Sequence, residues 1–251
     1  MTTHRFHIKD KPEGSAAIFL EGEEHHHLSK VARIRPGEQV WLFDDNGNQY
    51  KACVDMIAKK KTRLLILEIE KKREPKVRIT LAQVLLKTKN MDLVIQKATE
   101  LDAHAIAPVI SDRTVVRIEG KQDKKWARWK RIAIEASKQC GRSSVPDILS
   151  PVGLRTLLDR EEGAKKLFLS ERNGESLREI LMCPFREKKG IPESTILLVG
   201  PEGGWTEREE QDIMNSHYEA VSLGPLTLRS ETAAIVSLAM VAHFWKNAHV
   251  S

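Results

Sequence analysis

The chain has 251 residues, of which 41% are hydrophobic and 30% charged, and its formal net charge is +6. It is long enough to bury the core of one large domain or two modest ones, and no apolar run approaches the length of a membrane-spanning helix. The polar start of the chain is unlike a secretory signal, and the three widely spaced cysteines, Cys53, Cys140 and Cys183, argue against a disulfide framework or structural zinc. We therefore expect free thiols, no membrane segment and a cytoplasmic location.

The positive charge is unevenly distributed along the chain. Lys and Arg exceed Asp and Glu by three in residues 1–73 and by six in residues 87–142, whereas acidic residues exceed basic ones by four in residues 143–251. A segregated basic surface suits a phosphate backbone, so this distribution favours a nucleic-acid partner.

Short apolar stretches separated by turn signals make up most of residues 1–73, which lack long helical periodicity. Four of these stretches are predicted strands, at residues 17–20, 40–43, 53–57 and 64–69. Residues 45–48, DNGN, have the composition of a hairpin tip. Regularly spaced short strands of this kind predict a small β-barrel or sandwich.

One short helix is predicted over residues 25–35, with Lys30, Arg33 and Arg35 three and two residues apart. Three adjacent histidines, residues 25–27, begin this segment. Consecutive residues point in different directions on a helix or a strand, so these side chains do not converge on one ion. We expect packing or an RNA contact for them, and no metal.

Residues 71–75, KKREP, are charged, contain a proline and precede a change of pattern, so we place the domain boundary there. The predicted domains are residues 1–73 and residues 74–251. Residues 79–86 form a near-continuous apolar strand, of the type that is buried on both faces of a parallel sheet. A helix over residues 91–101 capped by Asn90, and a strand at residues 104–109, complete a βαβ unit.

The alternation of strands and helices continues along the rest of the chain. Further strands are predicted at residues 165–170, 196–199 and 220–223, and further helices near residues 124–140, 176–181, 206–217 and 231–245. This order of elements predicts an α/β domain with a mostly parallel sheet.

The run from residue 196 to residue 234 contains two strand–glycine-loop units, each leading into a helix. In the first, GPEGG exposes bare backbone amides, because Pro lacks an N–H and Gly accepts backbone angles closed to other residues. Thr206 and Glu209 have the spacing of a capping box, and Ser230 is the expected cap of the last helix. The glycines fit neither the P-loop nor the dinucleotide fingerprint. The two loops are a candidate ligand cradle, with ordinary turns as the alternative.

These two loops also carry a resemblance to a known family. GPEGGWTEREE followed by LGPLTLRSETAA closely resembles the SPOUT class of RNA methyltransferases, and within it the 16S rRNA uridine-N3-methyltransferase (RsmE) family. LLKTKNMDLVIQKATELDAHAIAPVISDRTVVR and EASKQCGRSSVPDI resemble two further motifs of that family, and EEHHHLSKVARIRPGEQVWLFDDNGNQY resembles its PUA-like RNA-binding module. The resemblance covers nearly the whole chain except residues 152–193.

The resemblance implies a fold and a cofactor. The expected architecture is a SPOUT-type α/β domain with a C-terminal trefoil knot, preceded by a small PUA-like β-barrel, in a homodimer whose site is completed across the subunit interface. The knot loops hold S-adenosylmethionine, whose adenine needs an apolar slot with close backbone approach. The expected cofactor-binding residues are Leu198, Val199, Gly200, Glu202, Gly203, Gly204, Leu223, Gly224, Leu226 and Leu228. No metal is needed, because the sulfonium already activates the methyl group.

The acceptor sets its own requirement. N3 of uracil lies between two carbonyls on the pairing edge, so the base must be unpaired, turned into a pocket and deprotonated. Negative charge then spreads onto O2 and O4, where a fixed cation lowers the barrier most directly. Arg229 is the candidate for that cation, and a purely structural pairing with Glu202 or Glu231 is the alternative. Glu231 is a candidate general base, or a carboxylate favoured by the start of a helix.

RNA contacts are expected at basic side chains that would hold phosphates without choosing a sequence. The candidates are Arg5, Lys30, Arg33, Arg35, Lys87, Lys89, Arg113 and Arg142, and for each of them a solvated surface position is the alternative. Lys87 and Lys89 follow the end of a predicted strand, where sites form in α/β sheets.

Two positions depart from the family pattern: Leu226 stands where an arginine is usual, and Lys138 where a glutamate is usual. The glycine framework, Arg229 and Glu231 remain, so we expect an S-adenosylmethionine-dependent methyltransferase that acts on N3 of a uridine in the 16S rRNA of the small ribosomal subunit. Two alternatives stay open. One is a SPOUT enzyme that methylates a tRNA ribose 2′-hydroxyl, and the other is a non-catalytic RNA-binding ribosome-assembly factor.

Overall fold

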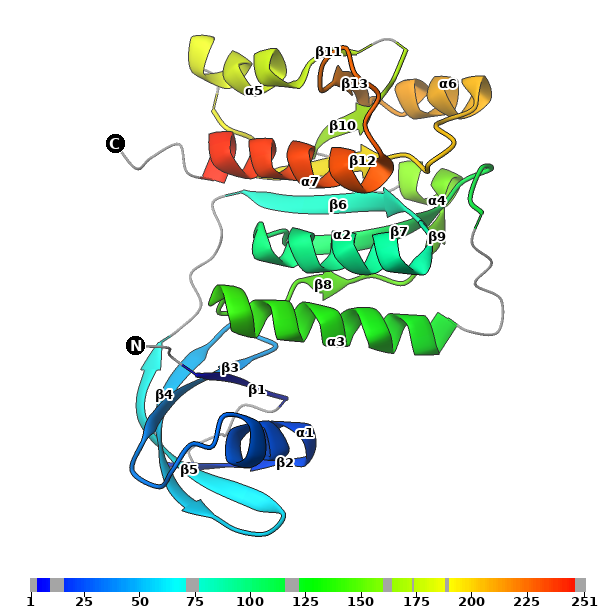
Figure 1. Ribbon diagram of the computed structural model, residues 1–251. Coiled ribbons are helices and arrows are strands. Elements are labelled where there is room, and N and C mark those ends of the chain that lie inside the picture. The colour runs from blue at the N-terminus through cyan, green and yellow to red at the C-terminus, as the bar shows by residue number, and fades with distance from the viewer. Residues whose placement is uncertain are drawn as a thin grey trace. The chain divides into compact units, whose positions relative to one another are not determined.

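The computed structural model describes residues 4–9, 16–70, 77–115, 122–159, 164–172, 174–187 and 190–246. The chain divides into two compact units (Figure 1). The first unit comprises residues 1–74 and 134–145, and the second comprises residues 75–133 and 146–251. The predicted boundary at residues 71–75 lies outside the described residues, so the domain limits stay a prediction. None of the described helices has the length and apolar character needed to cross a membrane.

The first unit is a five-stranded sheet that curves around the short helix α1 (Gly22–His26) (Figure 1). Its strands lie in the order β1 (Arg5–Ile8), β3 (Gln39–Asp44), β4 (Gln49–Ile57), β5 (Lys61–Glu70) and β2 (Ala17–Glu21). β1 pairs parallel with β3, and the other neighbours are antiparallel. Alternate side chains of these strands form the core of the unit, as the period of two of a strand requires. The four predicted strands and the hairpin tip between β3 and β4 are therefore confirmed.

The helix predicted over residues 25–35 is wrong at both ends. α1 begins at Gly22 and continues into a π-helical turn, η1 (His27–Val31). Arg33 has a φ of 53°, which lies outside the right-handed helical region and ends the segment. Lys30 therefore belongs to η1, whereas Arg33 and Arg35 follow it. His25 is buried and its Nδ1 lies 2.8 Å from Thr62 Oγ1, so this histidine packs inside the unit.

The second unit contains an eight-stranded sheet in which every pairing is parallel, which confirms the predicted α/β architecture. The strands run in the order β11 (Glu175–Ser176), β13 (Glu219–Ser222), β10 (Lys165–Leu169), β12 (Ser194–Val199), β6 (Arg78–Val84), β7 (Ala105–Ile110) and β8 (Asp147–Ile148), and β9 (Val152–Gly153) also pairs with β7. The two-residue strands β8, β9 and β11 were not predicted. The trefoil knot stays a prediction.

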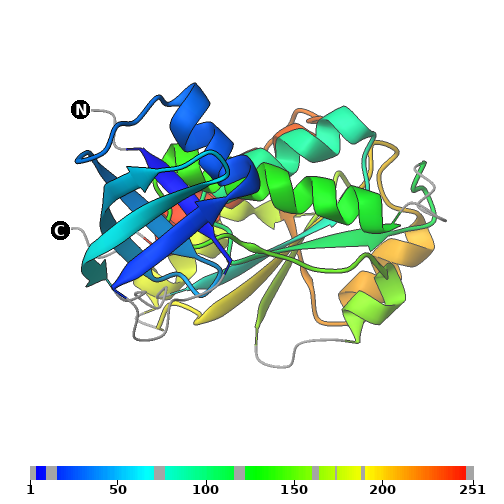
Figure 2. The same cartoon turned by 90° about the horizontal axis from the view of Figure 1, so that it is seen from below.

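Helices cover both faces of this sheet. α2 (Thr88–Glu100) lies on one side of it, and α4 (Leu154–Leu158) and α6 (Glu207–Asn215) lie on the other (Figure 2). α7 (Ser230–Val241), followed by the π-helical turn η2 (Ala242–Lys246), packs against α2 and against the central strands β12 and β6. α5 (Leu177–Arg186) also belongs to the second unit, whereas α3 (Gln122–Cys140) is divided, with residues 122–133 in the second unit and residues 134–140 in the first.

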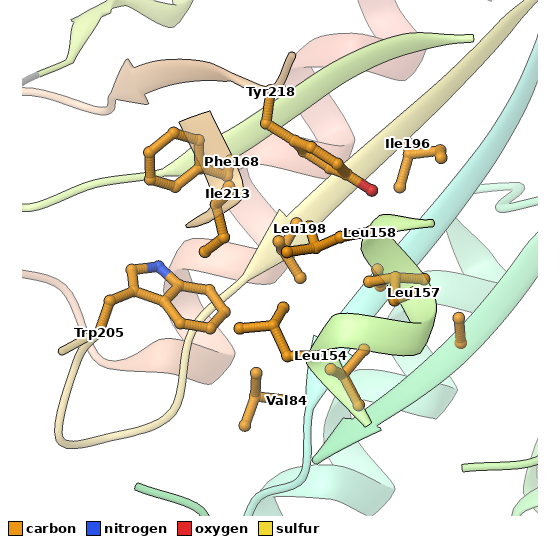
Figure 3. Packing of buried hydrophobic residues seen from close by; sticks show 13 residues of the cluster. Val84, Leu154, Leu157, Leu158, Phe168, Ile196, Leu198, Trp205, Ile213 and Tyr218 are labelled. Atoms are coloured by element: carbon orange, nitrogen blue, oxygen red, sulfur yellow. The ribbon is translucent and has the colours of Figure 1, made fainter. Parts of the chain in front are cut away.

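The core beneath α4 and α6 is shown in Figure 3. In this core, Leu198 and Ile196 of β12 pack with the leucines of α4. Trp205 and Phe168 belong to the same cluster of buried side chains. Successive side chains of a strand point to opposite faces, so the residues of β6 and β12 between these core positions face the helices on the other side. Gln83 in β6 is one of them.

Two predicted helix caps are wrong, and one is confirmed. α2 begins at Thr88 with Lys87 as its N-cap, so Asn90 lies inside the first turn. α7 begins at Ser230 with Arg229 as its N-cap, so the Ser230 hydroxyl does not cap the helix. The capping box at the start of α6 is present with both of its hydrogen bonds, between Thr206 and Glu209.

Candidate functional site

A cavity of about 570 Å³ lies in the second unit, at the carboxyl ends of β6, β10, β12 and β13. Ligands bind at this edge of parallel α/β sheets, and the volume is in the range of small-molecule sites. The ends of these strands and the segments that follow them supply most of the wall, in particular residues 199–202, 204, 205 and 221–231. The two glycine loops that the sequence singled out therefore line the same cavity.

The first loop is held in place by Trp205. Its indole Nε1 donates a hydrogen bond of 2.9 Å to the carbonyl oxygen of Leu169, at the end of β10. Arg113 donates from Nη1 to the carbonyl oxygens of Gly203, at 2.6 Å, and Trp205, at 3.3 Å. Gly204 has a φ of 65°, a conformation that favours glycine. Hydrogen bonds to the end of β10 and to the segment after β7 thus hold this loop in place.

The second loop is more open to solvent. Gly224 has a φ of 127°, and its N–H donates to Ser222 Oγ at 3.2 Å. Leu226 is 78% exposed at the wall of the cavity, and Val115 on the same cavity is 70% exposed. Leu228 is partly buried. The exposed part of the cavity wall therefore carries apolar side chains.

A hydrogen-bonded chain connects the two loops. Ser230 Oγ donates to the carbonyl oxygen of Gly200 and accepts from Gln83 Nε2 at 3.0 Å. Neither Gln83 nor Ser230 was predicted in this role, because the contact joins positions 147 residues apart in the chain and leaves no local pattern. Trp205 was also missed, although its place directly after the glycines was visible in the sequence.

Arg229 and Glu231 flank Ser230 and both line the cavity. Arg229 is exposed, and among the described residues its guanidinium has no hydrogen-bond or ion-pair partner, so neither Glu202 nor Glu231 neutralises it. Glu231 is only 8% exposed, and its Oε2 has no hydrogen-bond partner within the described part of the chain. The first turn of α7 favours a negative charge at this position. The structure thus brings a free cation and a buried carboxylate to one wall of the cavity.

Most of the predicted cofactor-binding residues lie on the cavity wall. They are Val199, Gly200, Glu202, Gly204, Leu223, Gly224, Leu226 and Leu228. Leu198 lies instead in the hydrophobic core under α4 and α6. Gly203 is outside the wall, where its carbonyl accepts the hydrogen bond from Arg113.

The predicted RNA-binding residues are distributed over both units. Lys87 lines the cavity, and Lys89 is exposed in the first turn of α2. Lys30, Arg33 and Arg35 are exposed in the first unit.

The remaining three candidates take part in hydrogen bonds inside their own units. Arg113 holds the first loop, as described above. Arg5 Nη2 donates to the carbonyl oxygen of Arg142 at 3.0 Å and to Gln49 Oε1, and burial lowers the pKa of the Arg5 guanidinium. Arg142 Nε donates to the carbonyl oxygen of Ser144 at 3.0 Å. Among the residues that the structure describes, no group of three His, Cys, Asp or Glu side chains is arranged to hold a metal ion.

Comparison with known sequence families gives two matches along the chain. Residues 72–242 match the family described as RNA methyltransferase domain, and residues 20–67 match the one described as RNA methyltransferase PUA domain. Ribosomal RNA small subunit methyltransferase E of Bacillus subtilis is 31% identical over 239 residues, which are 94% of this chain and 93% of that protein. The protein of the same name from Mycobacterium tuberculosis is 32% identical over 249 residues, covering 96% of this chain and 92% of that protein.

Two solved structures are also similar over almost the full chain. The crystal structure of ribosomal RNA small subunit methyltransferase E from Neisseria gonorrhoeae, bound to S-adenosyl methionine, has a TM-score of 0.87 and 33% identity and covers 97% of this chain and 98% of its own. The structure of a methyltransferase from Legionella pneumophila in complex with the bound cofactor S-adenosylmethionine has a TM-score of 0.85 and 31% identity. It covers 96% of this chain and 97% of its own.

Proposed function

Because the chain belongs to the ribosomal RNA small subunit methyltransferase E family, we propose that it transfers a methyl group from S-adenosylmethionine to N3 of a uridine in 16S rRNA. The observation that carries this proposal is the cavity of about 570 Å³, which both glycine loops line together with Arg229 and Glu231. A relative with 33% identity over nearly the full chain binds S-adenosyl methionine.

The residues of the cavity fit this cofactor. Gly200, Gly204 and Gly224 present bare backbone to the interior, and the side chains of Val199 and Leu223 provide apolar surface for an adenine. When bound, S-adenosylmethionine supplies a methyl group already activated on a sulfonium. The chain's own residues then have to hold the acceptor base and take up its proton.

Arg229 and Glu231 suit those two tasks. The Glu231 carboxylate, with a free Oε2, accepts the proton from N3 of the uracil, and the exposed Arg229 guanidinium stabilises the negative charge that spreads onto O2 and O4. With its proton held by Glu231, N3 would carry a free lone pair that could accept the methyl group of a bound cofactor. Direct transfer of this kind requires no covalent intermediate with the protein.

Basic side chains next to the cavity suit the RNA backbone. Lys87 lines the cavity and Lys89 is exposed in the first turn of α2, where both can neutralise phosphates on either side of the flipped nucleotide. The first unit, which matches the PUA description, adds the exposed cations Lys30, Arg33 and Arg35. We place the protein as a homodimer in the cytoplasm, acting on the small ribosomal subunit, and a sedimentation measurement of its mass tests the dimer.

The function is tested by methyl transfer from labelled S-adenosylmethionine to 30S subunits that lack rRNA modifications, with the modified nucleoside identified by mass spectrometry. The expected product is 3-methyluridine. A methylated ribose in tRNA in place of this product would indicate the 2′-hydroxyl enzyme. Tight RNA binding without cofactor binding or label would indicate the non-catalytic assembly factor.

Arg229→Ala tests the predicted cation in the same assay. We expect it to lower kcat by a factor of about 100 while S-adenosylmethionine still binds, since the charge it stabilises develops only during the reaction. Arg208→Ala is the matched control, because Arg208 is an exposed arginine of α6 that does not line this cavity. Equal activity of the two variants would remove Arg229 from the mechanism.

A further inference from the structure

The side-chain amide of Gln83 is fully buried in the middle of the sheet of the second unit. Its Nε2 donates to the carbonyl oxygen of Val84 at 2.9 Å and to Ser230 Oγ at 3.0 Å, and the carbonyl oxygen of Gly200 lies 3.4 Å away. Glutamine is mostly exposed in folded proteins, and burial of an amide is unfavourable unless it is hydrogen-bonded. A glutamine at this position of an apolar strand therefore needs an explanation.

The neighbouring groups fix the orientation of this amide. Ser230 Oγ donates its proton to the carbonyl oxygen of Gly200. Backbone carbonyls only accept, so the amide nitrogen of Gln83 has to face Val84 and Gly200, and the amide oxygen has to point away from them. Hydrogen bonds consequently run in one direction, from the Gln83 amide to the Ser230 hydroxyl and on to the Gly200 carbonyl.

The hydrogen bonds from Gln83 through Ser230 to Gly200 fix the distance between the first loop and the start of α7. Gly200 is the first residue of the loop after β12, and Ser230 is the first residue of α7, between Arg229 and Glu231. A displacement of Ser230 moves both neighbouring side chains relative to the first loop. Gln83 does not line the cavity itself, so its effect on a ligand there is indirect.

The arrangement is costly for stability. Gln83 Oε1 is buried and has no hydrogen-bond partner among the described residues. An unsatisfied buried acceptor destabilises the folded state, and an apolar side chain of similar size avoids this cost. Stability alone therefore does not explain the amide, whereas a requirement for its N–H groups does.

We propose that Gln83 is a positioning residue of the methyltransferase site, which holds the Gly200 loop and the start of α7 in the arrangement that binds S-adenosylmethionine and places Arg229 and Glu231. The inference rests on the proposed function, since it takes the cavity to be the cofactor site. It adds a residue of β6, a strand outside both glycine loops, to the groups on which the reaction depends.

Four variants test the chain of hydrogen bonds. Gln83→Met keeps a long side chain and removes the donor, Ser230→Ala removes the hydroxyl, and Ser230→Thr retains a hydroxyl. We expect Gln83→Met and Ser230→Ala each to raise the Kd for S-adenosylmethionine about tenfold and to lower kcat, and Ser230→Thr to stay within about twofold of the unaltered protein. The double variant Gln83→Met/Ser230→Ala should have the same Kd and kcat as the single variant with the larger defect, because both changes break the same connection.

Thr195→Val is the matched control. Thr195 lies in β12 of the same sheet, it is buried, and its Oγ1 has no partner within the described residues, but it belongs to neither loop. We expect this variant to change the melting temperature without changing the affinity for S-adenosylmethionine.

Hydrogen exchange of the ligand-free protein tests positioning without the cofactor. Peptides that cover residues 199–206 and 223–232 should exchange faster in Gln83→Met than in Thr195→Val, with no difference in peptides from β3 and β4. If Gln83→Met changes only the melting temperature, with unaltered affinity, kcat and exchange, the proposal is overturned. Failure of the unaltered protein to bind S-adenosylmethionine would instead refute the proposed function, and the exchange data would still decide whether Gln83 positions the loops.

Discussion

Gly200 lies directly against the indole ring of Trp205: a methyl group on its Cα would be 3.0 Å from Cε2 and 3.1 Å from Nε1 of the ring. The indole cannot move aside freely, because it is buried in the core under α4 and α6 and donates to Leu169. Packing against Trp205 is therefore a reason for glycine at this position that is independent of the proposed approach of a ligand.

Gly200→Ala should disturb this contact and the loop with it. We expect a loss of about 1–3 kcal/mol in the free energy of unfolding, as for overpacking in a core, and a weaker affinity for S-adenosylmethionine. Chemical denaturation and calorimetric titration measure the two effects. Gly153→Ala is the control, since nothing lies within 4 Å of the added methyl group there. If Gly200→Ala binds the cofactor as the unaltered protein does, the contact with Trp205 does not set the loop.

Elements with a local signal could be predicted from the sequence. The capping box of Thr206 and Glu209 and the hairpin tip at residues 45–48 depend on residues a few positions apart, and the central strands are continuous apolar runs. The two glycine loops were visible for the same reason.

Features that depend on tertiary contacts could not be predicted. Ser230 has the residue type of a cap, but its hydroxyl is hydrogen-bonded to Gln83 of β6 and to Gly200 of the loop after β12. Asn90 was expected to cap α2, whereas its Nδ2 donates to Glu202 Oε1 at 3.4 Å. Two-residue strands such as β8 are too short for any periodicity.

Lys138 illustrates how a departure from the family pattern is accommodated in the first unit. Its Nζ donates to Glu135 Oε1 at 2.8 Å and to Glu24 Oε1, and only 9% of its side chain is exposed. Lys138→Glu restores the residue type usual in the family but gathers three carboxylates, so we expect a loss of about 3 kcal/mol in unfolding free energy. Arg131→Glu, the same change of charge at an exposed position of α3, should cost no more than about 0.5 kcal/mol. Equal losses in both variants would contradict this reading of Lys138.

The buried phenol of Tyr50 makes the free energy of unfolding depend on pH in the alkaline range. Burial raises the pKa of its phenol well above the ordinary 10.0, and the hydrogen bond of 2.8 Å to Asp44 Oδ2 raises it further. The folded state therefore holds this proton at pH values where the unfolded chain releases it, so stability is complete below about pH 10 and falls as the pH rises above that value.

Tyr50→Phe removes this contribution. We expect the unfolding free energy of the unaltered protein to fall more steeply above pH 10 than that of the variant, which also lacks the bond to Asp44 and is less stable at neutral pH by about 1 kcal/mol. Denaturant unfolding between pH 8 and pH 11, at intervals of half a unit, measures both. Parallel curves for the two proteins would show that the Tyr50 phenol does not titrate differently on unfolding.

Leu226 stands where the family pattern has an arginine, and the substitution Leu226→Arg restores that positive charge. Its side chain is 78% exposed on the cavity wall, so Leu226→Arg should change the unfolding free energy by less than about 0.5 kcal/mol. If this position faces the RNA, the added charge neutralises one more phosphate, and a plot of the logarithm of the binding constant against the logarithm of the salt concentration becomes steeper by about 0.7–0.9. Leu226→Gln removes the apolar side chain without adding charge and should leave the slope unchanged. An unchanged slope in Leu226→Arg would instead place this loop away from the RNA backbone, and the arginine usual at this position would then act on the cofactor or within the protein.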